Sequence, residues 1–177
     1  MADINKEIKE NQIILVVISK DKYPVHLTEI LKGLNNNSQK ISYVSFNQPY
    51  NALNSLIQKN GLNVNKFFFI DTVTSSVQNP KPLNNCIFVS APNALTEVSV
   101  AVSKALSEQK CDAQVFDSLS ALLIYDSANS ITLFTHNVIT KLKISGSKAV
   151  FIALKEDISN ELIKDIYMFV DKVVELE

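Results

Sequence analysis

The chain has 177 residues, a formal net charge of −1 and an isoelectric point near 6.1, which fits one folded domain and excludes intrinsic disorder. All 17 basic residues are lysine, tryptophan is absent, and there are only three glycines. The composition therefore excludes an arginine finger, and it leaves almost no glycine for a phosphate-binding loop.

The apolar pattern alternates between strand and helix along the chain. Runs that are apolar at nearly every position predict strands buried on both faces, and apolar residues spaced i, i+3, i+4 and i+7 predict amphipathic helices. Residues 72–85 are polar and predict a loop, and residues 86–89 are either a short strand or the return of that loop. In chain order, we predict strand 13–18, helix 24–34, strand 41–46, helix 49–61, strand 67–70, helix 94–110, strand 113–116, helix 131–145, strand 149–154, helix 162–166 and strand 173–176.

The three glycines fall near predicted helix ends. Gly33, Gly61 and Gly146 each lie at the end of an apolar helical stripe, where the left-handed backbone favours glycine. Strands that alternate with helices predict an α/β fold, with a mostly parallel central sheet and helices on both faces. We expect residues 1–11 to form a polar N-terminal segment and residues 12–177 to form a single domain.

Nothing in the sequence predicts export or membrane insertion. The longest apolar run, residues 13–18, is far shorter than a bilayer span, and residues 1–10 lack the apolar region of a secretory signal. Cys86 and Cys111 are too few for a disulfide framework or a metal site, and buried free thiols suit a reducing compartment. We therefore expect a cytoplasmic protein.

Residues that follow the strands are candidates for a site, because ligands of open α/β sheets collect at the carboxyl ends of the strands. After strand 13–18, Lys20 and Lys22 offer positive charge, but no glycine presents backbone N–H groups to a phosphate. After strand 41–46 come Asn47 and Gln48, and an amide cannot act as a general base. The structural alternatives are a solvated lysine turn and a helix N-cap.

Two further strands end in aspartate. Asp71 follows strand 67–70, and Asp117 with Ser118 follows strand 113–116. A carboxylate at the end of a buried strand can hold Mg²⁺ through its water shell. The alternative, which we favour for each position from local sequence alone, is an aspartate that caps the next turn.

Two classes of function are not expected. The chain has no G-x-S-x-G elbow for ester hydrolysis, and a net charge of −1 without arginine lacks the basic footprint of a nucleic-acid-binding protein. Lys141, Lys143 and Lys148 cluster around Gly146, and we expect them to complement a helix C-terminus.

The order of the elements and several short motifs resemble the RecA-like ATPases of the KaiC-like branch, from about residue 12 to the end of the chain. The resemblance rests on residues 43–49, 59–62, 67–71, 115–120, 141–146 and 170–176. It implies a three-layer RecA-like domain in which residues 115–120 correspond to the Walker B strand. Asp117 is then the expected magnesium position and Ser118 the adjoining hydroxyl.

Two parts of the family pattern are missing. The phosphate loop would lie around residues 19–25, which contain no glycine, and the catalytic acidic pair would fall at Asn47 and Gln48. We therefore expect a pseudo-ATPase without a cofactor, acting as a regulatory or scaffolding protein. Its expected partner is another protein, such as an active relative, and a homo-oligomer is also expected.

The alternative is a noncanonical nucleotide switch that binds ATP with magnesium and hydrolyses little or none of it. Lys20 or Lys22 would contact the phosphates, and Asp117 would hold the metal. We rank this interpretation second because the turn after strand 13–18 contains no glycine.

Overall fold

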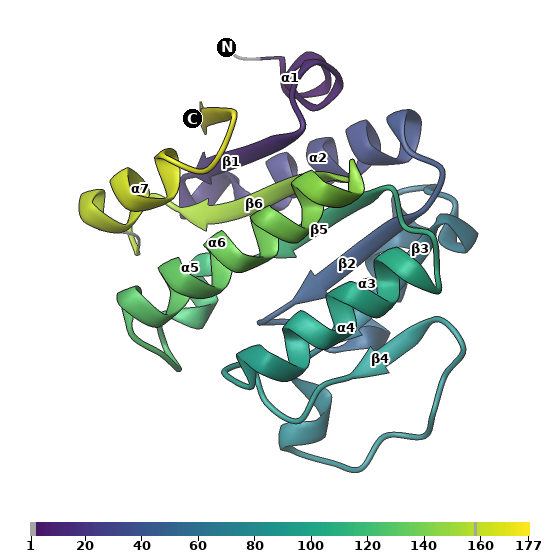
Figure 1. The fold of residues 1–177 in the computed structure, drawn as a ribbon. Coiled ribbons are helices and arrows are strands. Elements are labelled where there is room, and N and C mark those ends of the chain that lie inside the picture. Colours follow the sequence, from purple (N-terminus) through teal and green to yellow (C-terminus); the bar gives the residue numbers. More distant parts are fainter. Residues whose placement is uncertain (1–2, 158) are drawn as a thin grey trace.

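The computed structural model describes residues 3–157 and 159–177 and has a seven-stranded parallel sheet with strand order β4-β3-β2-β5-β6-β1-β7 (Figure 1). The strands are β1 Ile13–Ile18, β2 Ile41–Ser45, β3 Phe67–Asp71, β4 Cys86–Phe88, β5 Ala113–Asp117, β6 Lys148–Leu154 and β7 Lys172–Leu176. The helices are α1 Ile4–Glu10, α2 Tyr23–Asn37, α3 Tyr50–Lys59, α4 Leu95–Ser107, α5 Leu119–Leu122, α6 Ala128–Ser145 and α7 Asn160–Tyr167.

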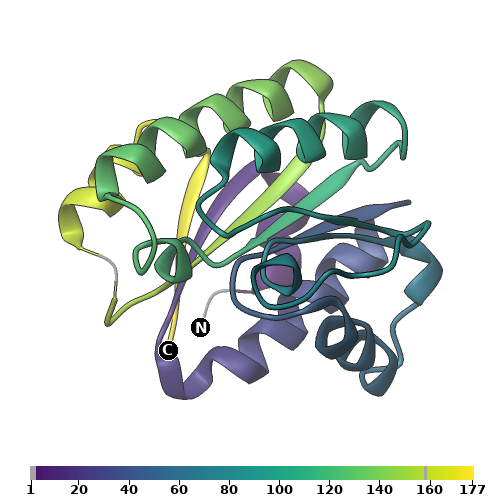
Figure 2. The same ribbon diagram turned by 90° about the horizontal axis from the view of Figure 1, so that it is seen from below.

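Helices cover both faces of the sheet, which confirms the predicted three-layer α/β architecture. Figure 2 shows α4, α6 and α7 on one face and α2 and α3 on the other. In β1, Leu15 and Val17 pack toward the first layer, whereas Ile14 and Val16 pack toward the second. Because each face of the strand is buried, the strand is apolar at every position.

The predicted strands and long helices are present, with differences at their ends. Residues 86–89 contain a true strand, β4, that pairs with β3. The helix expected to reach residue 110 ends at Ser107, and Lys110 has a positive φ of 57°. Helices α1 and α5 were not predicted. Within the described residues, no helix combines the length and the apolar character needed to cross a bilayer.

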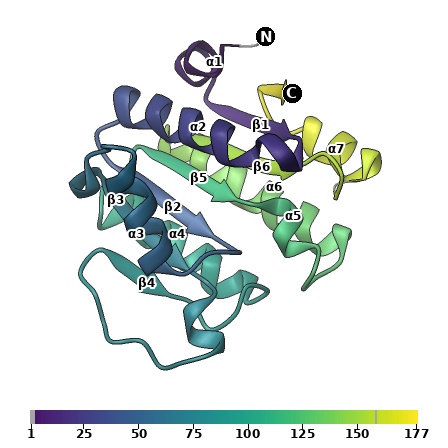
Figure 3. The ribbon, with the colours of Figure 1, turned by 180° about the vertical axis from the view of Figure 1, so that it is seen from behind.

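The prediction for Gly33 is wrong, because this glycine lies inside α2 rather than at its end. Helix α1 packs across α2 at this point (Figure 3). A Cβ atom on Gly33 would lie 2.8 Å from both Ile8 Cδ1 and Asn5 Oδ1. A larger residue at position 33 would therefore force the ends of these two side chains to shift, whereas Gly61 and Gly146 do adopt the left-handed backbone at helix ends.

Lys148 holds α1 against the domain. Its Nζ donates to the main-chain oxygens of Ile8, Lys9 and Asn11 at 2.7–3.1 Å, and desolvation lowers the pKa of the amine. These oxygens lie at the C-terminal end of α1, where a cation also complements the helix dipole. Lys148 does complement a helix C-terminus, as predicted, but of α1, whereas Lys143 pairs with Asp171.

We expect Lys148→Met to destabilise the protein by about 2 kcal/mol, because three carbonyl groups lose a charged donor. The backbone amides of α1 should then exchange with solvent hydrogen faster, which mass spectrometry measures. Lys143→Met removes a more exposed lysine of the same size and is the matched control. Unchanged exchange in α1 of the Lys148 variant would contradict this assignment.

Candidate functional site

The carboxyl ends of β1, β2, β5 and β6 border a pocket of about 510 Å³, which we call the Lys20 pocket. Strand β6 lies between β1 and β5 in the sheet. Lys20, Asn47 and Ser118 line the pocket together with Leu154 and Asp157. Three of the residues predicted from strand ends are therefore neighbours in the folded chain, although they lie far apart in sequence.

The turn after β1 is held by acidic residues that follow β6. A short 3₁₀ turn spans Lys20–Lys22. The backbone N–H of Lys20 donates to the Glu156 carboxylate at 3.1–3.2 Å, and its Nζ pairs with Asp157 at 2.5 Å. The hydrogen bond to Asp157 raises the pKa of Lys20. The groups that an anion would use here thus already contact carboxylates of the same chain.

Lys22, the other lysine predicted for this turn, is exposed. In the part of the chain that the structure describes, it forms no ion pair. It is not among the residues that line the Lys20 pocket.

Asp117 is fully buried at the end of β5 and lies between two tyrosines. We call these three residues the Tyr23–Asp117–Tyr43 cluster. Its Oδ2 accepts a hydrogen bond of 2.5 Å from the hydroxyl of Tyr23, at the start of α2, and another of 2.5 Å from Tyr43, in β2. Oδ1 has no hydrogen-bond partner among the described residues. Burial raises the pKa of Asp117, and the hydrogen bonds from the two tyrosines oppose that rise.

Ser118 is buried and acts as a helix cap. Its Oγ accepts from the backbone N–H of Ala121 at 3.2 Å, at the N-terminus of α5, and the peptide bond between Asp117 and Ser118 is cis. The hydroxyl therefore has a structural partner in this conformation.

Asn47 and Gln48 form an exposed turn between β2 and α3. Ser45 Oγ accepts from the Gln48 N–H at 3.0 Å and donates to the Gln48 carbonyl at 2.8 Å, which fixes the turn. The N-cap of α3 is Pro49, so the N-cap alternative is wrong for both amides. Asn47 lines the Lys20 pocket, whereas Gln48 lies in a smaller apolar hollow between α2 and α3.

Asp71 has the capping role that its sequence position also allowed. Oδ1 accepts from the N–H groups of Val73 and Thr74, and Oδ2 accepts from the Tyr50 N–H and the Thr74 hydroxyl, at 2.5–2.9 Å. The carboxylate joins the end of β3 to the start of α3. Over residues 3–157 and 159–177, no group of three or more His, Cys, Asp and Glu side chains is arranged to hold a metal ion.

Comparison with solved structures identifies the fold. A KaiC-like protein of the hyperthermophilic archaeon Pyrococcus horikoshii OT3 matches with a TM-score of 0.65 and 12% identity, over 93% of this chain and 70% of that chain. The chain has the RecA-like fold of that KaiC-like protein. At this identity the similarity shows the fold alone. No family model matches the chain, and no curated protein matches it.

Four side chains of the site in this RecA-like domain were missed from the sequence. Tyr23 and Tyr43 gave no signal, because one opens a helix and the other lies in an apolar strand, where aromatic residues are ordinary core. Glu156 and Asp157 lie just after β6, so examining that strand end as the others were examined would have found them.

The buried phenols and thiols predict a loss of stability at alkaline pH. Burial, followed by the charge of Asp117, raises the pKa of Tyr23 and of Tyr43 well above 10, and burial raises the pKa of Cys86 and of Cys111 to about 12. Groups with a raised folded pKa add stability that is complete below their unfolded pKa and is lost as pH rises above it.

We therefore expect the free energy of unfolding to fall from about pH 9 upward, by as much as about 1.4 kcal/mol per pH unit for each group that titrates only in the unfolded state. Urea unfolding at stepped pH measures this fall. Tyr23→Phe should make the slope shallower above pH ~10, where an unfolded phenol ionises. The same slope in both proteins would contradict the proposed burial of this phenol.

Proposed function

We propose that this protein is a RecA/KaiC-like domain that does not hydrolyse ATP and acts through protein contacts, as a regulatory or scaffolding subunit. The observation that carries the proposal is the Tyr23–Asp117–Tyr43 cluster. By the resemblance, Asp117 corresponds to the magnesium position. Its Oδ2, however, accepts hydrogen bonds from two phenol hydroxyls. A metal ion or its water shell could reach Oδ2 only by displacing both tyrosines, and the remaining oxygen, Oδ1, is buried.

The turn after β1 supports the same proposal. A phosphate there would meet the carboxylates of Glu156 and Asp157, which contact the backbone and the side chain of Lys20. The negative charges of these two carboxylates would repel the negative charges of a triphosphate bound beside Lys20. Asn47, the amide that reaches the pocket, cannot take a proton from an attacking water.

The partner we propose is a protein, either an active relative with the same fold or further copies of this chain. A net charge of −1 without arginine disfavours nucleic acid. Cys86 and Cys111 are both buried free thiols, which supports a reducing, cytoplasmic location.

The second candidate is a nucleotide switch with little or no hydrolysis. The Lys20 pocket favours it, because about 510 Å³ is within the usual range of ligand pockets and the pocket collects Lys20, Asn47 and Ser118. Binding would require Lys20 to leave Asp157. Magnesium on Oδ2 of Asp117 would require Tyr23 and Tyr43 to move.

Calorimetry with ATP and magnesium, combined with a phosphate-release assay, separates the two candidates. We expect neither binding heat nor turnover, and no rise in unfolding free energy at millimolar ATP, where a micromolar ligand would add about 3 kcal/mol or more. Micromolar binding with turnover would overturn the proposal. Binding without turnover, lost in Lys20→Ala and in Asp117→Ala but kept in Lys22→Ala, would establish the switch instead.

A further inference from the structure

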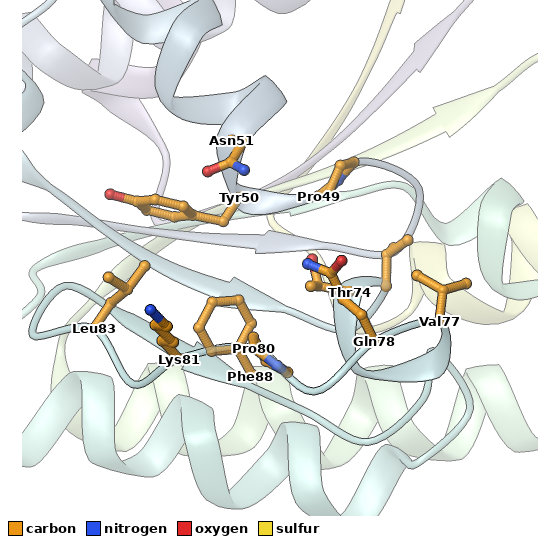
Figure 4. A pocket seen from close by; sticks show the side chains of 11 residues that line it. Pro49, Tyr50, Asn51, Thr74, Val77, Gln78, Pro80, Lys81, Leu83 and Phe88 are labelled. Atoms are coloured by element: carbon orange, nitrogen blue, oxygen red, sulfur yellow. The ribbon is translucent and has the colours of Figure 1, made fainter.

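A second pocket lies at the β4 side of the sheet (Figure 4). Its volume is about 430 Å³, and it is bordered by the start of α3, the turn after β3 and the end of β4. We call it the Tyr50–Phe88 pocket after two aromatic residues that line it. It shares no lining residue with the Lys20 pocket.

The walls of the Tyr50–Phe88 pocket are largely apolar. Figure 4 shows Tyr50 on one side and Phe88 with Leu83 on the other. The rings of Tyr50 and Phe88 meet edge to face, with centroids 6.5 Å apart. Leu83 is 41% exposed and Val77 is 82% exposed, so the apolar surface continues from the pocket onto its rim. An apolar side chain from another molecule would be desolvated here.

Three polar side chains also line this pocket without partners of their own. Asn51, Gln78 and Lys81 are exposed, and in the described structure their side chains make neither a hydrogen bond nor an ion pair. An amide side chain both donates and accepts, as does a peptide group, and the lysine ammonium only donates. The combination suits a peptide with a carboxylate next to an apolar residue.

Lys81 is the only charged residue among those that line the pocket, and its positive charge favours an acidic ligand. Between Glu29 and Glu97 the only acidic residue is Asp71, which is buried and fully engaged in hydrogen bonds. Glu97 itself accepts hydrogen bonds from Ser90.

We propose that the Tyr50–Phe88 pocket binds an extended acidic peptide segment of a partner protein. An apolar side chain of the segment enters the pocket, its backbone meets the amides of Asn51 and Gln78, and a neighbouring Asp or Glu pairs with Lys81. This inference rests on the proposed role in protein contacts and names the chemistry of the partner.

To test this proposal, a displayed library of random peptides is selected for binding to the intact protein. The affinity of a selected peptide is then measured by fluorescence anisotropy. We expect enrichment of sequences with an apolar residue beside Asp or Glu. Lys81→Glu should weaken binding about fivefold or more, because an attraction becomes a repulsion. Lys59→Glu changes the same charge at the far end of α3 and should leave affinity within twofold, as a matched control.

A second variant tests whether the change in peptide affinity is caused only by long-range charge. Gln78→Ala leaves the net charge unchanged and should also weaken binding, while added salt should weaken the wild type more than Lys81→Glu. Enrichment of basic or purely polar sequences, no enrichment, or equal effects of Lys59→Glu and Lys81→Glu would overturn the inference. These outcomes are independent of the ATP calorimetry, which alone decides whether the domain is a non-hydrolysing one.

Discussion

Asp117→Ala is expected to destabilise the protein by about 3 kcal/mol, because the hydroxyls of Tyr23 and Tyr43 would lose their acceptor inside the fold. Both hydroxyls donate to Oδ2 of this fully buried carboxylate. A carboxylate kept only to hold a metal would behave in the opposite way, because its removal from the metal-free protein relieves a buried charge. Urea unfolding followed by circular dichroism measures the difference.

Asp117→Asn is the matched control, since the amide keeps an oxygen that can accept from a phenol. We expect it to lose about 1 kcal/mol, and Tyr23→Phe and Tyr43→Phe to lose about 1 kcal/mol each. If the urea midpoint of unfolding of Asp117→Ala equals or exceeds that of the wild type, the cluster does not stabilise the fold. That result would also remove the main support for a non-hydrolysing domain.

Asp71→Ala is expected to destabilise the protein by about 4 kcal/mol, because this fully buried carboxylate accepts four hydrogen bonds. Three of the donors are backbone N–H groups, which would be left without an acceptor. The loss should be local at first, so the amides of Tyr50 and Thr74 should exchange faster than those of β1. Chemical denaturation and hydrogen exchange measure the two effects.

Glu97→Ala is the control for Asp71→Ala. Glu97 also accepts from a backbone N–H and a hydroxyl, both of Ser90, but it lies on the surface. We expect little change of stability in this variant. Equal denaturation midpoints for the two variants would contradict the role of Asp71 as the joint between β3 and α3.

Much of the fold could be predicted because each strand is buried on both faces. A strand such as β1, apolar at all six positions, has no other stable place than the centre of a covered sheet. The same logic failed for α1, a seven-residue helix with only Ile4 and Ile8 buried, since two apolar residues in a polar segment give no clear period. Gly33 was misassigned for the same reason, because the helix that packs on it was not predicted.

The site was predictable only in its positions, not in its contacts. The strand-end rule found Lys20, Asn47 and Ser118, which the fold does bring to one pocket. It did not show that Asp117 meets two phenols, because a hydrogen bond between residues 94 positions apart leaves no local signal. The absence of hydrolysis stays a prediction until ATP is tested.

The position of β1 has a consequence for synthesis of the chain on the ribosome. Among the described residues, this wholly apolar strand pairs only with β6 and β7, which are translated about 130 residues or more after it. At usual elongation rates it must wait on the order of ten seconds for its neighbours. Until β6 has been made, the growing chain therefore carries an unpaired apolar strand, and premature termination before Lys148 would leave this strand permanently without its partners.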